Sequence, residues 1–327
     1  MRLLSTRTTP PRRRVQPILF FSIVVAVIIA TMAPPAAASP QLRAIDLGTL
    51  YGRCCSHATA VNDRGEVVGS SFETDKPRHA FVWRNGQMTD LGFSWASDIN
   101  NHGDIVGTNY LGGITFHAML WRDGRTVDLG TLGGSVSHAL AINDTGEVVG
   151  ASTVAGDNEM HAFSWRDGVM TDLGPVGYGV AYDINNRGQI VGNNGFLPVR
   201  WQRGTVQALT THHGQATAIN DRGQIVGSFY DGSSSHSFLW SAGRITEIVT
   251  PVEADYVDVY GINNRGDVVG GTGHGAFRWR QGQMTILPEL TPGVLTTATD
   301  INNRGQIVGY SSTDFFSHHA RAVLWTY

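Results

Sequence analysis

Short runs of alternating hydrophobic and small residues, separated by polar turns, follow one another along the chain from residue 40 onward. Residues 138–142 and 147–152 predict two strands around a tight turn in which Gly146 supplies a positive φ. Residues 161–165 and 169–173 predict two more strands around a second turn. No segment after residue 40 shows the 3.6-residue period of a helix. The pattern therefore predicts an all-β protein built from units of four short antiparallel strands.

The four-strand unit recurs seven times. In each copy a hydrophobic residue and an Asn lead into a polar turn that ends in Gly-x-Ile/Val-Val-Gly, and a Trp follows in the third strand. Successive Asn residues are 38, 43, 42, 35, 43 and 39 residues apart. Repeats of about 40 residues with four strands each are typical of β-propeller blades. The Asn residues are Asn62, Asn100, Asn143, Asn185, Asn220, Asn263 and Asn302, and the Trp residues are Trp83, Trp121, Trp165, Trp201, Trp240, Trp279 and Trp325.

The two ends of the chain predict how a ring of blades closes. The last copy stops just after Trp325, at the end of its third strand, whereas residues 42–48 match the fourth strands at 126–130 and 170–174. A strand exchange of this kind hides an exposed sheet edge. We therefore expect a seven-bladed β-propeller of four-stranded blades, with the N-terminal strand completing the last blade. A β-sandwich or a stacked β-solenoid is the alternative, but a sandwich gives no reason for seven equal units.

Three repeated positions have structural interpretations. A small residue stands four positions before each Asn, six times Ala and once Val259, as expected where innermost strands converge. A Gly inside each second strand, such as Gly150, is expected to face a large neighbour, for which the repeat Trp is the candidate. The Asn itself is expected to cap its own hairpin turn through side-chain to backbone hydrogen bonds. We assign these positions to the scaffold.

Residues 1–38 have the composition of a secretory signal peptide. Five Arg residues precede an apolar run at 18–30, and a segment of small residues ends at Ala38. The run is shorter than the roughly 20 residues of a bilayer span, so we expect cleavage and no membrane span afterwards. The run from Arg12 to Arg14 resembles a twin-arginine signal, but the following residues fit that pattern poorly and favour general secretion. We expect residues 39–327 to form one propeller domain, secreted to the extracellular space or the cell envelope.

Charge narrows the range of partners. Removal of residues 1–38 takes away five of the 24 basic residues and none of the 27 acidic ones, which leaves a formal net charge of about −8. An acidic surface disfavours nucleic acid and anionic membranes. We expect a monomer whose partner is an extracellular glycan or protein.

Residues 45–327 resemble the secreted bacterial HAF-repeat family, which is named for a His-Ala-Phe signature. The signature stands at 79–81 and 161–163, and looser forms stand at 117–119 and 236–238. The resemblance implies an extracellular repeat protein and carries no established activity. Copies four, six and seven depart from the signature, with Leu197, Gly275 and Arg321 in the His position. A function that needs every His is therefore not expected.

Two sets of side chains are candidates for ion binding. The signature His residues lie on separate blades, so we expect packing or turn hydrogen bonds and no metal site. Asp98, Asp183 and Asp300 stand two positions before the repeat Asn, where the other copies have Ala or Gly, and are expected near the central channel. With that Asn they resemble the opening of a calcium loop, although its later ligands are absent. We expect channel hydration and turn capping, and no cofactor, with calcium as the alternative.

Cys54 and Cys55 are the only cysteines in the sequence. In an exported protein they are able to form an adjacent-residue disulfide, while two free thiols or a link to another chain remain open. The sequence has no Gly-x-Ser-x-Gly elbow, phosphate loop or nucleotide fingerprint, so nucleophilic hydrolase and cofactor chemistry find no support.

One face of the propeller is expected to carry variable loops. The first-to-second and third-to-fourth turns are short and uniform, whereas the distance from the strand-interior Gly to the Trp varies from 9 to 16 residues. Variable loops on a rigid scaffold usually carry recognition, and exposed aromatic groups suit glycan or protein surfaces. The residues predicted to bind a ligand are Trp95, Tyr51, Tyr110, Tyr178 and Tyr230, with Asp98, Asp183 and Asp300 at the channel. Further loop aromatics are Phe72, Tyr256, Phe315 and Phe316.

The sequence supports three hypotheses about function. The first is a secreted, non-enzymatic propeller that binds a glycan or a protein through its variable-loop face. The second is an extracellular glycan hydrolase or lyase that uses acidic residues at the channel mouth, although the sequence fixes no two acids at a catalytic separation. The third is a passive envelope component. We take the first as the prediction and assign no catalytic residue.

Overall fold

The computed structural model describes residues 42–52, 54–73, 76–174, 178–250, 256–313 and 319–327. All of them belong to one compact unit, Pro40–Tyr327. In this part of the chain every regular element is a strand, and no helix has the length and apolar character needed to cross a membrane. The signal peptide predicted for residues 1–38 lies outside the described residues.

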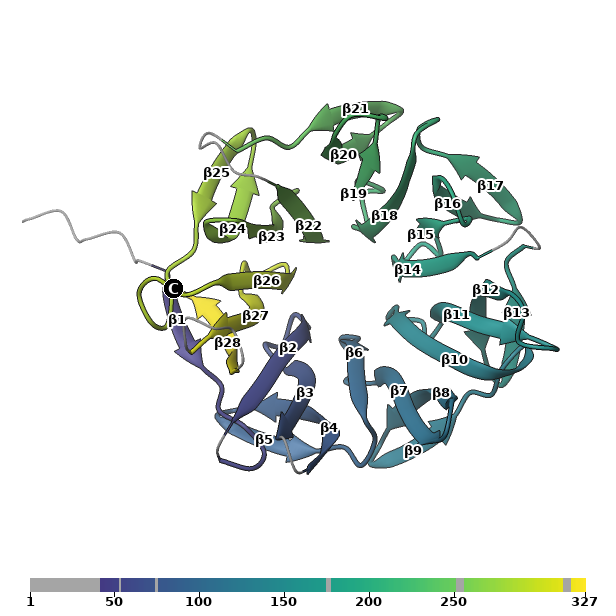
Figure 1. Ribbon diagram of the computed structural model, residues 1–327, viewed down its shortest axis with the longest axis horizontal. Helices are drawn as coiled ribbons and strands as arrows, with labels where there is room; N and C mark the ends of the chain where they lie inside the picture. The colour runs from purple at the N-terminus through teal and green to yellow at the C-terminus, as the bar shows by residue number, and fades with distance from the viewer. Residues whose placement is uncertain (1–41, 53, 74–75, 175–177, 251–255, 314–318) are drawn as a thin grey trace, which may run out of the picture. The chain divides into compact units, whose positions relative to one another are not determined.

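The described residues form 28 strands, and the sheets that they make are arranged around a common axis (Figure 1). The innermost strands are β2 (Cys55–Val61), β6 (Trp95–Ile99), β10 (Gly133–Ile142), β14 (Val180–Ile184), β18 (His213–Ile219), β22 (Val257–Ile262) and β26 (Thr296–Ile301). The second strands are β3 (Val67–Glu73), β7 (Ile105–Gly112), β11 (Val148–Val154), β15 (Ile190–Asn193), β19 (Ile225–Tyr230), β23 (Val268–Thr272) and β27 (Ile307–Ser312).

Two further strands complete each sheet toward the outside. The third strands are β4 (Lys76–Arg84), β8 (Thr115–Arg122), β12 (Met160–Arg166), β16 (Pro198–Gln202), β20 (Ser235–Ser241), β24 (Gly275–Arg280) and β28 (Ala320–Thr326). The outermost strands are β5 (Gln87–Asp90), β9 (Arg125–Asp128), β13 (Val169–Asp172), β17 (Thr205–Ala208), β21 (Arg244–Glu247), β25 (Gln283–Ile286) and β1 (Arg43–Asp46).

Strands pair antiparallel from the axis outward within each sheet. Five sheets of the described residues have four strands, and β6 to β13 form one larger sheet because a single parallel bridge from Val136 to Phe116 joins β10 to β8. Each innermost strand contacts the innermost strand of the next sheet, and β26 contacts β2. The predicted all-β fold of four-stranded units is confirmed.

The sheet at the C-terminal end takes its outermost strand from the other end of the chain. β1 pairs with β28, with Arg43 opposite Thr326 and Asp46 opposite Val323. The match between residues 42–48 and the fourth strands of other copies therefore reflects a real pairing.

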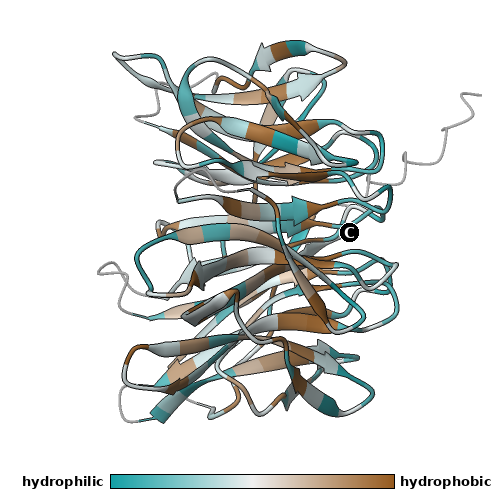
Figure 2. Cartoon of the chain, turned by 90° about the vertical axis from the view of Figure 1, so that its right-hand side faces the viewer, coloured by the Kyte–Doolittle hydropathy of each residue, from teal (hydrophilic) through white to brown (hydrophobic). Residues whose placement is uncertain are grey.

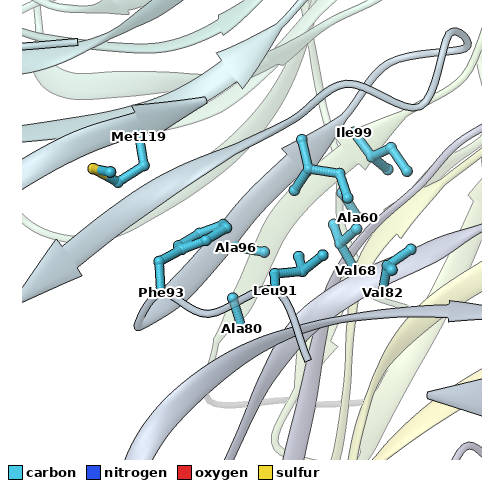
Figure 3. Packing of buried hydrophobic residues seen from close by; sticks show 10 residues of the cluster. Ala60, Val68, Ala80, Val82, Leu91, Phe93, Ala96, Ile99 and Met119 are labelled. Carbon is cyan, nitrogen blue, oxygen red and sulfur yellow. The ribbon is translucent and has the colours of Figure 1, made fainter. Parts of the chain in front are cut away.

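The hydrophobic core lies between neighbouring sheets. One cluster joins Ala60 of β2 and Val68 of β3 to Ala96 and Ile99 of β6, with Phe93 from the preceding connection packed against them (Figure 3). Comparable clusters lie between other pairs of sheets. Hydrophobic residues accordingly gather along the strands, and hydrophilic residues gather in the turns that connect them (Figure 2).

The strand-interior glycines are explained by the innermost strand, and the contact predicted with the repeat Trp is wrong. Each innermost strand has a β-bulge three residues before the Asn, as between Val259 and Gly261 in β22. A Cβ on Gly270, which lies opposite, would come 1.8 Å from the carbonyl oxygen of Asp258. The residue of β24 that pairs with Gly270 is Phe277, two residues before Trp279. Glycine is therefore needed because the bulged backbone approaches closely.

Substitution of Gly270 by Ala should lower the free energy of unfolding by about 3 kcal/mol, since the new methyl group would force the bulge away from β23. Gly271 is the matched control, because a Cβ there would meet its nearest neighbour, Thr297, at 3.6 Å. Gly271→Ala should change stability little. Equilibrium unfolding in guanidinium chloride measures both variants. Equal losses for the two would contradict this explanation.

Candidate functional site

The repeat Asn side chain caps its own turn, as the sequence predicts. Asn143 follows β10, and its Oδ1 accepts hydrogen bonds from the backbone N–H groups of Thr145 and Glu147, both at 3.0 Å. The same two bonds occur at each of the other six Asn residues. The turn motif is therefore held by one side-chain oxygen.

The amide nitrogen of the same Asn binds the neighbouring sheet, which the sequence analysis missed. Asn143 Nδ2 donates to the carbonyl oxygen of Asn185 at 3.2 Å. The corresponding bond forms at every step and measures 2.8–3.2 Å. At the last step Asn302 donates to the carbonyl oxygen of Asn62 at 2.8 Å. We call these seven residues the Asn ring. All seven are buried.

A second ring runs beside the first, through the residue that follows each Asn. The backbone N–H of Asn101 donates to Oδ1 of Asp144 at 2.8 Å, and the N–H of Asp144 donates to Oδ1 of Asn186 at 2.8 Å. The remaining steps are alike. The sequence signal was available, because this position holds only Asn or Asp: Asp63, Asn101, Asp144, Asn186, Asp221, Asn264 and Asn303.

A polar cavity of about 160 Å³ lies where the two rings meet the axis. It is lined by the Asn ring, by the residues of the second ring, by the hydrophobic residue before each Asn, and by Asp98 and Asp300. The walls are therefore built mainly from side chains that already bind neighbouring sheets.

Asp98, Asp183 and Asp300 each bridge two sheets at this end of the fold. Oδ1 of Asp98 accepts the N–H of Ile99 at 2.7 Å, and Oδ2 accepts the N–H of Ile142 in the next sheet at 2.8 Å. Asp183 binds the N–H groups of Ile184 and Ile219 in the same way. Asp300 binds those of Ile301 and Val61.

The position of the Asp residues among the copies follows from this geometry. Each carboxylate serves its own sheet and the next, so an acid in two consecutive copies would direct two carboxylates at one N–H. Each copy has one such N–H group, on the residue before the repeat Asn, and the three acids bind six of the seven. The seventh belongs to Ile262, and Gly261 stands just before it in the Asp position. A Cβ on Gly261 would lie 3.3 Å from Oδ1 of Asp300, which leaves little room for a larger residue.

The environment makes the three carboxyl groups weak acids. Burial raises the pKa of Asp98 to about 6, of Asp183 to about 8 and of Asp300 to about 7, while the backbone N–H bonds act in the opposite direction. Charge on Asp98 further raises the pKa of Asp183 and Asp300. The three groups therefore share one electrostatic environment. Among the described residues, no three His, Cys, Asp or Glu side chains gather closely enough to hold a metal ion.

The structure does not bring the predicted aromatic residues and the Asp residues together. Trp95 begins β6, whereas Asp98 stands near its other end, beside the turn that follows. Tyr51, Tyr110, Tyr178 and Tyr230 likewise lie on or next to the connections at the ends of the sheets remote from the Asn ring. We call that side, with the second-to-third and fourth-to-first connections, the variable-loop face.

The aromatic residues of this face have different surroundings. The ring centroids of Trp95 and Tyr110 lie 6.0 and 5.2 Å from that of Phe116, and the guanidinium of Arg78 lies 5.8 Å from the Trp95 ring. Tyr51 is half-buried and packs edge-on against His79.

Tyr178 and Tyr230 are 67% and 51% exposed, and their hydroxyl groups donate to the carbonyl oxygens of Asn158 and Gly232. Phe72 stacks with Arg78 at 3.9 Å. Phe315 and Phe316 lie outside the described residues.

The signature His residues bind carboxylates within their own sheets, whereas the sequence predicts packing or turn hydrogen bonds. His161 Nδ1 lies 2.7 Å from Oδ2 of Asp172 on the outermost strand, and this bond raises the pKa of His161. His79, His117 and His236 bind Asp90, Asp128 and Glu247 in the same way. The copies with Leu197 and Gly275 have Ala208 and Ile286 in place of the acid. Each His therefore joins the third strand to the fourth.

Cys54 and Cys55 form a disulfide, with an S–S distance of 2.00 Å. The structure thus selects the adjacent-residue disulfide among the three alternatives. Cys54 ends the connection between β1 and β2, and Cys55 begins β2, on the variable-loop face.

No protein-family model matches the chain, and no curated protein matches its sequence. Solved structures do resemble it. The β-propeller domain of the Trilobed protease from Pyrococcus furiosus is 10% identical with a TM-score of 0.57, over 83% of this chain and 95% of that one. YCF48 bound to D1 peptide is 14% identical with a TM-score of 0.55, over 90% and 99%.

An acylaminoacyl peptidase from Pyrococcus horikoshii is 11% identical with a TM-score of 0.54, over 83% of this chain and 51% of the peptidase. This chain therefore spans about half the length of the peptidase. At such identities the likeness shows the fold alone. The chain has a β-propeller fold.

Stability should fall as the pH rises through the range in which the bridging carboxyl groups ionise. An aspartate in the unfolded chain ionises near pH 4, whereas Asp183 keeps its proton to about pH 8 in the folded state. Between these two pH values the folded protein binds more protons than the unfolded chain does. The contribution of Asp183 to the unfolding free energy is therefore complete below about pH 4 and is lost as the pH rises toward 8. Asp183→Asn should reduce the dependence of the unfolding free energy on pH by up to about one proton between pH 5 and 8.

Chemical denaturation at a series of pH values provides this measurement. Asp157→Asn is the control, because hydrogen bonds from Thr153 and Ser135 hold the pKa of Asp157 below its usual range and outside this window. An unchanged dependence in Asp183→Asn would show that Asp183 is already charged at pH 5.

Proposed function

We propose that the chain is a secreted, non-enzymatic binding protein that recognises a glycan or a protein through its variable-loop face. The observation that carries this proposal is where the exposed aromatic side chains lie. Five of them stand on or beside the connections of this face: Tyr110, Tyr178, Phe196, Tyr230 and Tyr256. Exposed aromatic side chains on the connecting loops of a rigid scaffold favour recognition.

We further propose that the scaffold is a closed ring of seven blades. The Asn ring supports this proposal, because each of its seven hydrogen bonds joins one repeat to the next and the bond from Asn302 returns to Asn62. The pairing of β1 with β28 supports closure by the N-terminal strand. A closed ring would hold the loops of the variable-loop face at fixed separations, so a ligand could bind with little ordering of the protein.

The two faces differ in the use of their polar groups, which supports the choice of the variable-loop face. At the opposite end the two rings and the bridging carboxylates bind backbone groups of the neighbouring sheets. These groups have less capacity left for a ligand. On the variable-loop face the five exposed aromatic residues keep 48–67% of their surface open to solvent.

We also propose that the protein is exported, that it is related to the HAF-repeat family and that it is a monomer. The disulfide between Cys54 and Cys55 supports an oxidising compartment, since disulfides persist mainly outside the cytosol. The leader at residues 1–38 supports secretion.

A glycan hydrolase or lyase is the second candidate, and the raised pKa values of the acids around the polar cavity favour it. Acids that change charge near neutral pH are suited to proton transfer. The hydrogen bonding opposes it, because both oxygens of Asp98 and both oxygens of Asp300 accept backbone N–H groups. Binding without catalysis is therefore the better-supported function.

The double variant Trp95→Ala, Tyr110→Ala should weaken binding on a glycan array or in a pull-down of extracellular proteins by at least about tenfold, because it removes two anchors of one surface cluster. Tyr327→Ala is the control. Tyr327 is 51% exposed, close to the 49% of Tyr110, and lies at the end of β28 away from the variable-loop face.

Unchanged binding in the double variant would rule out the proposed surface. If the wild-type protein cleaves a polysaccharide and Asp98→Asn abolishes that cleavage, the result would instead support the glycan hydrolase or lyase.

A further inference from the structure

A second concave surface on the variable-loop face lies between two neighbouring sheets. It is a pocket of about 320 Å³, near the lower end of the range of about 300–1,000 Å³ for ligand sites. Phe196, in the connection between β15 and β16, forms one wall, and Tyr230 at the end of β19 belongs to the other. Phe196 is 59% exposed. The remaining lining residues are Gly195, His213, Gly214, Gln215, Ser228, Phe229 and Ser235.

The Phe196 wall is held in place by its own backbone. Asn194 Oδ1 accepts the N–H groups of Phe196 and Leu197 at 3.3 and 2.9 Å. The carbonyl oxygen of Phe196 accepts the N–H of Gly214 in β18 at 2.9 Å, which ties the loop to the next sheet. The ring packs edge-on against His213, with 5.7 Å between centroids. The wall is thus formed before any ligand arrives.

The opposite side of the pocket is equally well supported. Phe229 is stacked between His212 and His236, with centroid distances of 5.3 and 5.2 Å. His236 is in turn fixed by Glu247 and by Asp231, at 2.7 and 3.0 Å. A ligand would therefore meet a rigid aromatic surface, and little conformational entropy would be lost on binding.

Beside His213, the lining combines apolar rings with the polar side chains of Gln215, Ser228 and Ser235, and it contains no Asp, Glu, Lys or Arg. In the part of the chain that the structure describes, the side chains of Gln215, Ser228 and Ser235 make no hydrogen bond to protein. Their polar atoms are therefore available to a ligand. A cationic ligand would find no carboxylate in the lining, and an anionic ligand would find no Lys or Arg. A purely apolar ligand would leave these polar groups unpaired.

A sugar ring matches this combination, because its C–H groups form an apolar face and its hydroxyl groups surround the edge. We propose that this pocket is a binding subsite for an uncharged sugar unit of a glycan, stacked against Phe196 and Tyr230 and hydrogen-bonded by Gln215, Ser228 and Ser235. The proposal rests on the proposed recognition function and selects a neutral glycan over a protein. Nucleic acid is disfavoured, since its phosphates would need cationic partners.

Saturation-transfer NMR and calorimetric titration against neutral tetrasaccharides test the subsite. Suitable probes are cellotetraose, xylotetraose, maltotetraose, mannotetraose and chitotetraose. Phe196→Ala and Tyr230→Ala should each weaken binding of the recognised tetrasaccharide by about tenfold, because each removes a stacking surface. Gln215→Ala, which leaves the aromatic rings in place, should weaken it by a smaller factor. Tyr327→Ala, with the same exposure as Tyr230, should leave binding unchanged.

The outcomes separate this subsite from the broader function. Tetrasaccharide binding that survives both Phe196→Ala and Tyr230→Ala would overturn the subsite and leave glycan recognition standing. Absence of binding to every tetrasaccharide, with a protein partner captured and lost in Trp95→Ala, Tyr110→Ala, would overturn the subsite and retain the recognition face. Unfolding curves of the two aromatic variants that match the wild type would exclude loss of structure as the cause.

Discussion

The side-chain amide of one Asn per repeat is the interaction on which the structure most depends. Its oxygen holds the turn of its own hairpin, and its nitrogen binds the carbonyl oxygen of the Asn in the next repeat. Few other side chains are able to do both, because the amide is a short group with an acceptor and a donor. A buried backbone carbonyl left without a partner would cost about 1–3 kcal/mol. Local turn geometry and assembly of the sheets are thereby linked in one residue.

This arrangement divides the molecule into a structural end and a variable end. Around the polar cavity the backbone N–H groups of the residues that precede the repeat Asn need acceptors, and Asp98, Asp183 and Asp300 supply them across pairs of sheets. All three acids are buried, and burial disfavours their charged form, so the pKa of each is raised. At the other end the connections differ from copy to copy and carry exposed aromatic rings. Sequence variation is tolerated there because the rings of hydrogen bonds lie elsewhere.

Much of the fold could be read from the sequence, and the reasons are local. Alternation, turn glycines and the forty-residue period report contacts within one repeat, so the strands, the four-stranded units and the capping role of the Asn were predicted correctly. For the signature His residues the sequence predicts packing or turn hydrogen bonds, whereas the observed bonds reach an acid on the fourth strand. Their acidic partner was visible eleven residues later, as in His161 and Asp172, but it was not identified.

What the sequence analysis missed involves contacts between repeats. The Nδ2 bond of the Asn reaches a residue about forty positions away, and nothing in one copy signals it. The reason for Gly270 was misassigned because a β-bulge leaves no mark in the hydrophobic pattern. The sequence analysis predicts one set of eight ligand residues, whereas Trp95 and Asp98 stand near opposite ends of the same innermost strand. The pocket at Phe196 was overlooked, because its two walls come from different repeats.

Hydrogen exchange of the Asn side-chain amides, followed by NMR in protein labelled with ¹⁵N-asparagine, tests the role of the Asn ring most directly. If the ring joins the sheets, the seven repeat Asn amides should exchange together and only when the sheets separate. Asn158, which is exposed, should exchange many orders of magnitude faster and serves as the internal reference. Exchange of the seven amides at the rate of Asn158 would contradict the account.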